Sequence, residues 1–237
     1  MILEFLSNIE LFYAPRDYIS TDSIILRDEE LRHAVKVMRY KADDKIFITN
    51  GEGNIYECSV LTINKDFLNA RINNSISYQN KFQNIIFCLP KLKNPERIRF
   101  LIEKCVELGV TKFTLFDADR SISKSNNIER WNKVALSAMK QSIRSFLPQI
   151  SLAGNLDWVV NSDSEKIIFE QNSKQTLNSI ELKKANTHFI FGPEGGLSQR
   201  EINLFEQKNL FRLTKNRLRS ETAAIFTAAF LNSILEK

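Results

Sequence analysis

The sequence predicts an α/β protein with two domains, a small β-barrel over residues 1–72 and a larger domain of alternating strands and helices over residues 84–237. In the first region, short segments rich in β-branched and aromatic residues follow one another closely, with one helical segment among them. A polar, turn-prone run over residues 73–83 separates the two domains. After this run, segments typical of buried strands alternate with amphipathic helices, which indicates a mostly parallel sheet covered on both faces.

The composition is that of an ordinary globular protein with a basic bias. Hydrophobic residues make up 43% and charged residues 26% of the chain, and the formal net charge of +5 favours a polyanionic partner, although many basic proteins bind no nucleic acid. The sequence has two histidines and no Cys-x-x-Cys motif, so it offers no plausible ligand set for zinc or iron. The longest apolar stretch, Thr222–Leu235, is too short to cross a bilayer. The three cysteines lie in apolar runs, which is typical of buried free thiols in a reducing compartment: Cys58, Cys88 and Cys105. We therefore expect a cytoplasmic protein without a metal or a membrane partner.

Four strands are predicted for the N-terminal domain, with a strong turn at Asn50-Gly-Glu-Gly53 between two of them. The strands are Ile24–Leu26, Lys45–Thr49, Ile55–Leu61 and Phe67–Ile72. Between the first two, Asp28 is suited to cap a helix whose apolar face is formed by Leu31, Ala34, Val35 and Met38.

This predicted helix also carries a basic stripe. Arg32, Lys36 and Arg39 are spaced i, i+4 and i+7 and fall on a face that the apolar residues do not use. Such a stripe is usually a solvated surface, and the functional interpretation is a ridge that binds phosphates. His33 lies beside the stripe and could equally be a packed histidine.

Strand and helix signals alternate through the C-terminal domain. Asn94, Pro95 and Gly109 suit the N-cap, first and C′ positions of one helix, and a second helix is expected from Glu129 to Ser145 and to be ended by Pro148. The strands are Asn84–Leu89, Lys112–Phe116, Lys166–Phe169 and His188–Phe191. The last helix presents one broad side made of Thr222, Ile225, Phe226, Ala229, Phe230, Ser233 and Ile234. A side this broad could simply belong to the core.

A glycine turn follows the last of these strands. Gly195 and Gly196 permit positive φ and allow another molecule to approach the backbone closely. Ser198 stands three residues before Glu201, which is the spacing of a capping box, so a helix is expected to begin at Gln199. A strand, a glycine turn and a helix start form a cradle of free backbone N–H groups, although such turns more often only connect a strand to a helix.

A second polar turn comes before the last helix, and together the two turns resemble a known signature. The sequence Gly-Pro-Glu-Gly-Gly-Leu-Ser, followed by Leu-x-x-x-Arg-Leu-Arg-Ser-Glu-Thr-Ala, resembles the C-terminal motifs of the SPOUT methyltransferases. Among these, the chain is most similar to the bacterial family that methylates N3 of a uridine in 16S ribosomal RNA. The likeness covers nearly the whole chain and includes Lys104–Val110, Asp119–Ser121, Gln141–Arg144 with Pro148, and His33–Arg39.

The resemblance implies a fold, a cofactor and partners. It implies a PUA-like N-terminal domain that grips RNA through Arg32, His33, Lys36 and Arg39. It also implies a C-terminal SPOUT domain with a trefoil knot, an active site at a homodimer interface, and 16S ribosomal RNA, within the small subunit, as substrate. By this resemblance S-adenosylmethionine is held among the knot loops by Glu170, Gly192, Pro193, Glu194, Gly195, Gly196, Leu213, Leu218, Arg219 and Ser220.

Two catalytic candidates follow from the same resemblance. Methylation at N3 requires loss of an imide proton, so negative charge spreads over the uracil oxygens and must be stabilised. Arg144 matches the family's arginine and could donate paired hydrogen bonds to that charge, or could be an exposed cation at a helix end. Glu221 could accept the proton or could cap the last helix, and Glu194 is expected to pair with Arg219.

The chain departs from the family at two positions. Thr214 and Asn216 stand where the family usually has glycine and arginine. A β-branched residue cannot take positive φ cheaply, so either the turn differs here or the glycine is not required. One alternative is therefore a noncatalytic RNA-binding protein on the same scaffold, and another is a SPOUT methyltransferase that acts on a different RNA nucleotide. A dinucleotide-dependent oxidoreductase is disfavoured, because the glycine turn is not Gly-x-Gly-x-x-Gly.

Overall fold

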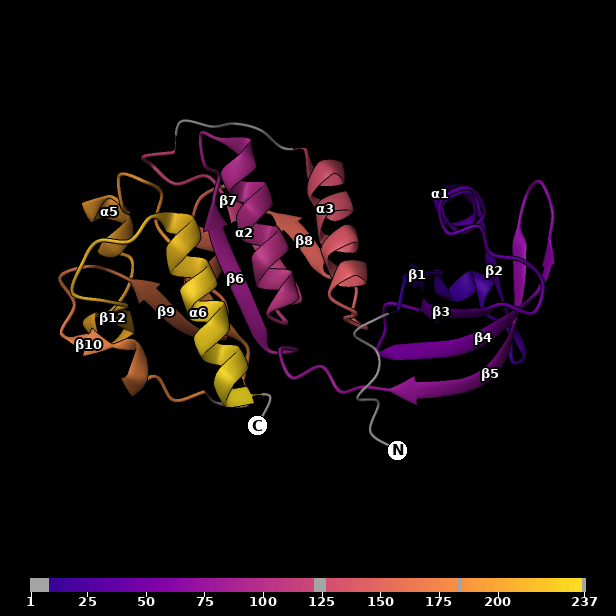
Figure 1. Ribbon diagram of the computed structural model, residues 1–237. Helices are drawn as coiled ribbons and strands as arrows, with labels where there is room; N and C mark the ends of the chain where they lie inside the picture. The colour runs from indigo at the N-terminus through magenta and orange to yellow at the C-terminus, as the bar shows by residue number, and fades with distance from the viewer. Residues whose placement is uncertain (1–8, 122–126, 183–184, 236–237) are drawn as a thin grey trace. The chain divides into compact units, whose positions relative to one another are not determined.

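The computed structural model describes residues 9–121, 127–182 and 185–235, and the chain divides into two compact units (Figure 1). The first unit contains the residues up to Asn80 together with a later segment, Met139–Leu147. The second contains Lys81–Ala138 and the residues from Pro148 onward. The later segment of the first unit was not anticipated from the sequence, which assigned it to the C-terminal domain.

The first unit is built on a five-stranded sheet in the order β1-β3-β4-β5-β2. β1 pairs with β3 in parallel, and the remaining neighbours are antiparallel. The strands are β1 (Leu11–Tyr13), β2 (Ser23–Leu26), β3 (Lys45–Thr49), β4 (Asn54–Ile63) and β5 (Leu68–Ser77), and a 3-10 helix, η2, spans Arg16–Tyr18. The four predicted strands are confirmed, while the three-residue β1 was missed.

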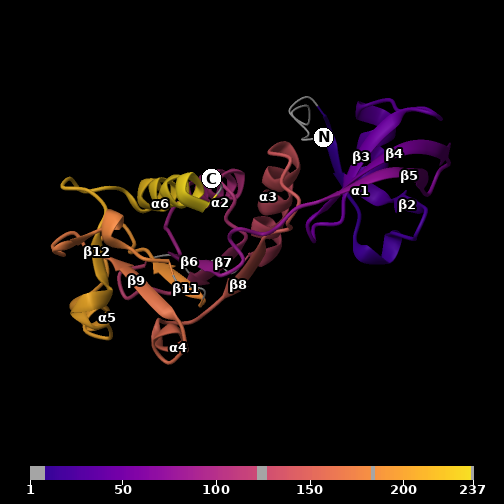
Figure 2. The ribbon, with the colours of Figure 1, turned by 90° about the horizontal axis from the view of Figure 1, so that it is seen from below.

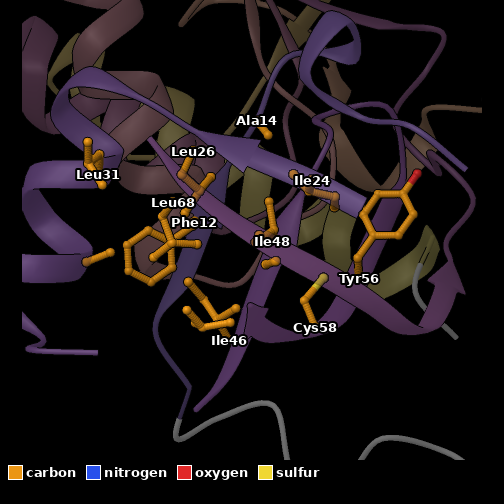
Figure 3. Close-up of a cluster of buried hydrophobic side chains, with 13 residues drawn as sticks. Phe12, Ala14, Ile24, Leu26, Leu31, Ile46, Ile48, Tyr56, Cys58 and Leu68 are labelled. Carbon is orange, nitrogen blue, oxygen red and sulfur yellow. The ribbon is translucent and has the colours of Figure 1, made fainter. Parts of the chain in front are cut away.

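The core of this unit lies on one side of the sheet (Figure 3). Phe12 from β1, Ile46 and Ile48 from β3 and Leu68 from β5 are at most 1% exposed, and Cys58 is buried beside them. Burial raises the pKa of the Cys58 thiol to about 12, as expected for a cysteine that serves as a small apolar residue.

The helix between β2 and β3 differs from the prediction at its start. α1 spans Asp28–Arg32, and its N-cap is Arg27, which makes no side-chain capping hydrogen bond. Asp28 is the first helical residue, so its expected role as the cap is wrong. A short side chain before a helix is a local signal that the surrounding packing can override.

The same helix also changes its winding. It continues as a π-helical turn, η3 (His33–Val37), in which the Met38 N–H donates to the His33 carbonyl at 3.0 Å. The wider turn rotates the later residues, so Met38 is 40% exposed although it was expected on the apolar face. Arg39 follows the helix with φ of 58°, so the basic residues do not form a regular i, i+4, i+7 stripe.

The second unit is built on a seven-stranded, wholly parallel sheet in the order β10-β12-β9-β11-β6-β7-β8. The strands are β6 (Ile85–Pro90), β7 (Lys112–Phe116), β8 (Gln149–Leu152), β9 (Glu165–Phe169), β10 (Gln175–Thr176), β11 (Thr187–Ile190) and β12 (Leu210–Arg212). The helices are α2 (Pro95–Glu107), α3 (Ile128–Gln141), α4 (Asp157–Val160), α5 (Gln199–Ile202) and α6 (Ser220–Leu235), with 3-10 turns η4 (Leu177–Ser179) and η5 (Gln207–Asn209).

Helices cover both faces of this sheet, as predicted. Figure 2 shows α2, α3 and α6 on one face and α4 and α5 on the other. Asn94 caps α2 by accepting from the Glu96 N–H at 2.9 Å, and Gly109 follows the helix with φ of 99°. Both ends of α2 are therefore confirmed. The trefoil knot stays a prediction.

The second predicted helix is wrong at its C-terminal end. α3 stops at Gln141 rather than Ser145, and the next residues turn away to join the first unit, so Pro148 does not end the helix. No residue range was predicted for the short elements β8, β10, β12 and α4. Within the described ranges, no helix combines the length and the apolar character that crossing a membrane requires.

Candidate functional site

A cavity of about 490 Å³ lies at the carboxyl ends of β9, β11 and β12. Phe169 ends β9, Phe191 directly follows β11, and Leu213 directly follows β12; all three line the cavity. Because β11 and β12 both pair in parallel with β9, their carboxyl ends meet at one edge of the sheet. In open parallel sheets, this edge is where ligands bind.

The glycine turn after β11 forms one wall of the cavity. A Cβ atom on Gly192 would lie 3.0 Å from the Leu197 backbone nitrogen, so a side chain there would push the turn open. Gly196 has φ of 69°, and its N–H donates to the Pro193 carbonyl at 2.8 Å, which closes the turn. Ser198 and Glu201 form the predicted capping box, and α5 begins at Gln199. The tight turn therefore depends on the missing side chain at Gly192 and on the backbone freedom of Gly196.

Three long side chains cross-link the loops around the cavity. Arg120 donates through Nη1 to the Gly195 carbonyl at 2.7 Å, and Arg217 donates to the Glu194 carbonyl. Gln171 donates to the carbonyls of Thr214 and Lys215 at 3.2 and 2.9 Å. Each contact joins loops that follow different strands, so the cavity walls are held at fixed separations.

A further cross-link joins the start of α5 to Asp119. Its carboxylate accepts hydrogen bonds from the Arg200 guanidinium and from Ser198 Oγ, while its N–H donates to Glu201 Oε1 at 3.0 Å. The bonds from Arg200 and then from Ser198 hold the pKa of Asp119 at about 2, so the carboxylate stays ionised. Asp119 therefore holds the start of α5, and with it the glycine turn, against the loop after β7.

Replacing Asp119 with asparagine is expected to weaken binding of S-adenosylmethionine, the cofactor that the sequence resemblance implies, by about tenfold, because an ion pair is exchanged for a weaker hydrogen bond to an uncharged amide. Calorimetric titration of S-adenosylmethionine measures this change. Asp163→Asn is the matched control, since Asp163 is exposed and lies outside the cavity. Equal affinities for the two variants would show that Asp119 does not shape the binding turn.

Arg97 connects the glycine turn to the last helix. Its Nη1 lies 3.3 Å from Glu194 Oε1, and its Nε lies 3.7 Å from Glu221 Oε1. The expected pairing of Glu194 with Arg219 is therefore wrong, because Glu194 pairs with Arg97 on α2. Glu221 is 8% exposed and is not among the residues that line the cavity, and its Oε2 has no hydrogen-bond partner among the described residues.

The predicted cofactor residues gather at the cavity with one exception. Arg219 is exposed and is not part of the lining; the residues that do line it are Glu170, Gly192, Pro193, Glu194, Gly195, Gly196, Leu213, Leu218 and Ser220. Thr214 also lines the cavity without taking positive φ, so the turn at the family's glycine position does not require one here. Its hydroxyl donates to the Asn216 carbonyl at 2.5 Å and closes the turn locally.

Sequence reasoning missed two arginines that shape this site, Arg97 and Arg120. Arg120 lies in the Asp119–Ser121 stretch that carried the resemblance, so it had a signal. Arg97 had none, since it appears in the sequence as one charged residue of an amphipathic helix. Arg217 lies in the second motif next to Asn216, where it can take the place of the family's arginine, and it lines the cavity.

The remaining candidates belong to the first unit. Arg144 lies in its later segment, and Arg32, Lys36 and Arg39 are exposed on and after α1 and η3. His33 is half-buried, with Nε2 2.8 Å from Glu10 Oε1 and its ring 5.6 Å from that of Phe12. These contacts favour the packed interpretation of His33 over a direct role in binding RNA.

Family models match two regions of the chain. An RNA methyltransferase domain matches residues 79–232, and an RNA methyltransferase PUA domain matches residues 26–73. The whole lining of the cavity falls within the first of these regions. The second region includes the basic residues of α1 and η3.

Individual proteins match over most of the chain. The ribosomal RNA small subunit methyltransferase E of Bacillus subtilis is 28% identical and covers 86% of this chain and 87% of its own length. The protein of that name from Mesomycoplasma hyopneumoniae is 32% identical, with coverages of 85% and 90%. The crystal structure of a ribosomal RNA small subunit methyltransferase E from Neisseria gonorrhoeae bound to S-adenosyl methionine has a TM-score of 0.84 at 26% identity, covering 95% of this chain and 98% of that one.

Proposed function

This chain belongs to the RNA methyltransferase family, and we propose that it transfers a methyl group from S-adenosylmethionine to N3 of a uridine in small-subunit (16S) ribosomal RNA. The observation that carries the proposal is that the matched methyltransferase domain contains the complete cavity at the carboxyl edge of the sheet. The matched PUA domain supports RNA as the substrate. A cytoplasmic location follows from that substrate.

The residues around the cavity suit this cofactor. The turn at Gly192 leaves backbone groups accessible where a side chain would block them, and Phe169 and Phe191 add flat apolar surface. Ser220 lines the cavity, and its Oγ is buried without a hydrogen-bond partner among the described residues, so it can bond to a ligand. When bound, S-adenosylmethionine supplies an electrophilic methyl group on its sulfonium.

The protein must stabilise the uracil once the N3 proton is lost. We assign this role to Arg144, whose guanidinium can donate two hydrogen bonds to a uracil oxygen or to a flanking phosphate. Glu221 is better suited to brace the site than to accept the proton, because its carboxylate is paired with Arg97 and lies outside the cavity lining. Arg97 joins it to Glu194 on the glycine turn.

A homodimer is part of this proposal. The broad side of α6 that was described from the sequence lies at the surface. Phe226 and Ile234 on this side are 44% and 38% exposed, while Ala224, Ala228 and Leu231 on the opposite side are fully buried. Phe100 on α2, which packs against α6, is also 49% exposed. An apolar surface of this kind is typical of an interface between subunits.

The proposal predicts that the purified protein binds S-adenosylmethionine and S-adenosylhomocysteine in metal-free buffer. Titration calorimetry with each compound, and with NAD as the control, measures this directly. Binding of both compounds but not of NAD supports a methyltransferase over an oxidoreductase. No heat with either compound at millimolar concentration would overturn the enzyme assignment and favour a noncatalytic RNA-binding protein.

A further inference from the structure

The segment that contains Arg144 is held by the first unit, although it directly follows a helix of the second. After α3 ends at Gln141, the chain turns and pairs with the loop between β3 and β4. Glu52 of that loop and Phe146 form an isolated antiparallel bridge. The conformation around Arg144 is therefore set by contacts with residues of the N-terminal half of the chain.

The backbone next to Arg144 is strained. Ile143 has φ of 56°, a left-handed conformation that is rare for a β-branched residue. The Arg144 N–H donates to the Met139 carbonyl at 2.9 Å, which turns the chain sharply at this point. A conformation of this kind persists only where surrounding contacts hold it, and such conformations cluster at functional sites.

The loop between β3 and β4 supplies the first set of these contacts. The Gly53 N–H donates to the Ser145 carbonyl at 2.9 Å, and the Leu147 N–H donates to the Gly51 carbonyl at 2.8 Å. Gly53 has φ of 106°, and a Cβ on it would lie 2.6 Å from the Phe146 ring. Asn50, which is 3% exposed, accepts from two N–H groups of its own loop and keeps the loop rigid. Only a glycine at position 53 allows Phe146 to pack against this loop.

An ion pair anchors the segment at its other end. Lys140 Nζ lies 2.6 Å from Glu30 Oε1, and both side chains are more than four-fifths buried. Glu30 also accepts from the Tyr13 N–H through Oε2 at 3.2 Å, and Lys140 lies 5.8 Å from the centre of the Phe12 ring. The last turn of α3 is thereby attached to both β1 and α1 of the first unit.

We infer that the N-terminal unit positions Arg144 for methyl transfer, with Gly53 and Glu30 as positioning residues that hold the strained Ile143–Arg144 backbone. The inference rests on the proposed role of Arg144. The unit that carries the basic residues proposed to bind RNA then also sets the geometry of the group that stabilises charge on the base. Removing a positioning contact lowers the rate of the chemical step without changing the cofactor cavity.

The test is a double-mutant cycle that combines Gly53→Ala with Arg144→Ala. We expect Gly53→Ala alone to lower the single-turnover rate, at saturating cofactor and RNA, by about tenfold to a hundredfold, and to leave affinity for S-adenosylmethionine unchanged. In the Arg144→Ala background, Gly53→Ala is expected to lower the single-turnover rate no further, because both substitutions remove the charge stabilisation that Arg144 provides. Gly154→Ala is the matched control, since its added Cβ would meet nothing within 4 Å.

A second variant covers the case in which Gly53→Ala does not fold. Glu30→Gln removes the charge that pairs with Lys140 but keeps an oxygen that can accept from Tyr13, and the exposed neighbour Glu29→Gln is its control. Glu30→Gln is expected to lower the single-turnover rate less than Gly53→Ala does. It is also expected to leave the affinity for S-adenosylmethionine unchanged and to have no further effect in the Arg144→Ala background. The positioning inference is overturned if the fold-loss in single-turnover rate caused by either variant multiplies with that of Arg144→Ala when the two substitutions are combined. It is also overturned if neither Gly53→Ala nor Glu30→Gln changes the rate. If Arg144→Ala itself leaves the rate unchanged, the proposed role of Arg144 fails, and the inference fails with it.

Discussion

Arg144→Ala is expected to lower the single-turnover rate of methyl transfer by about a hundredfold or more, the usual effect of losing one preorganised donor that stabilises developing charge. The affinity for S-adenosylmethionine is expected to stay nearly unchanged, because every residue that lines the cavity belongs to the other unit. Rapid-quench measurement of methyl incorporation into RNA gives the rate, and calorimetry gives the affinity.

The control for this substitution is Arg99→Ala. Arg99 is an exposed arginine on α2 that pairs with Glu96, so its loss removes one positive charge without touching the cavity. If Arg144→Ala and Arg99→Ala have the same single-turnover rate as the original protein, Arg144 is only a surface charge and another group must stabilise the uracil.

Replacing Arg32, Lys36 and Arg39 together with glutamate is expected to weaken binding to RNA or to the small ribosomal subunit strongly. All three side chains are exposed, and the π-helical turn separates them without burying any. Each lost phosphate contact is expected to flatten the slope of log affinity against log salt by about one for a duplex site. A salt titration of binding measures this slope, and cofactor affinity is expected to survive.

A second triple variant separates contact from net charge. Changing Lys133, Lys174 and Lys208 to glutamate alters the net charge equally, at exposed positions of the second unit. The plots of log affinity for RNA against log salt concentration are compared for the three proteins. If both triple variants give lines parallel to that of the original protein, with similar intercepts, then Arg32, Lys36 and Arg39 form an ordinary solvated surface and do not bind RNA.

Features encoded by neighbouring residues could be predicted from the sequence. Asn94, Pro95 and Gly109 mark the ends of α2, and Ser198 with Glu201 mark the start of α5, because capping bonds join residues only a few positions apart. A local signal of the same kind led to a wrong prediction at Asp28, which is the first residue of α1 and not its N-cap. Short strands such as β12 carried too few residues to show a periodic pattern.

The contacts that build the site could not be predicted, because they join distant parts of the chain. Asp119 pairs with Arg200, and Arg97 pairs with both Glu194 and Glu221. These partners are too far apart in the sequence for a periodic pattern to indicate the pairing. In the sequence, Arg97 and Arg200 look like exposed charges on helices, and no local pattern indicates their partners. Their partners are decided by which strands lie side by side in the sheet.

By itself, the sequence determined the alternation of strands and helices, the glycine turn and the motifs that resemble a methyltransferase signature, because these depend on the backbone freedom and periodicity of adjacent residues. Only the tertiary structure decided that Ser142–Leu147 leaves the axis of α3 and joins the N-terminal unit. A helical pattern favours continuing the helix through this segment. The hydrogen bonds from Gly53 and Leu147 and the ion pair between Glu30 and Lys140 offset the strain at Ile143, and these exist only once residues about a hundred positions apart have packed together.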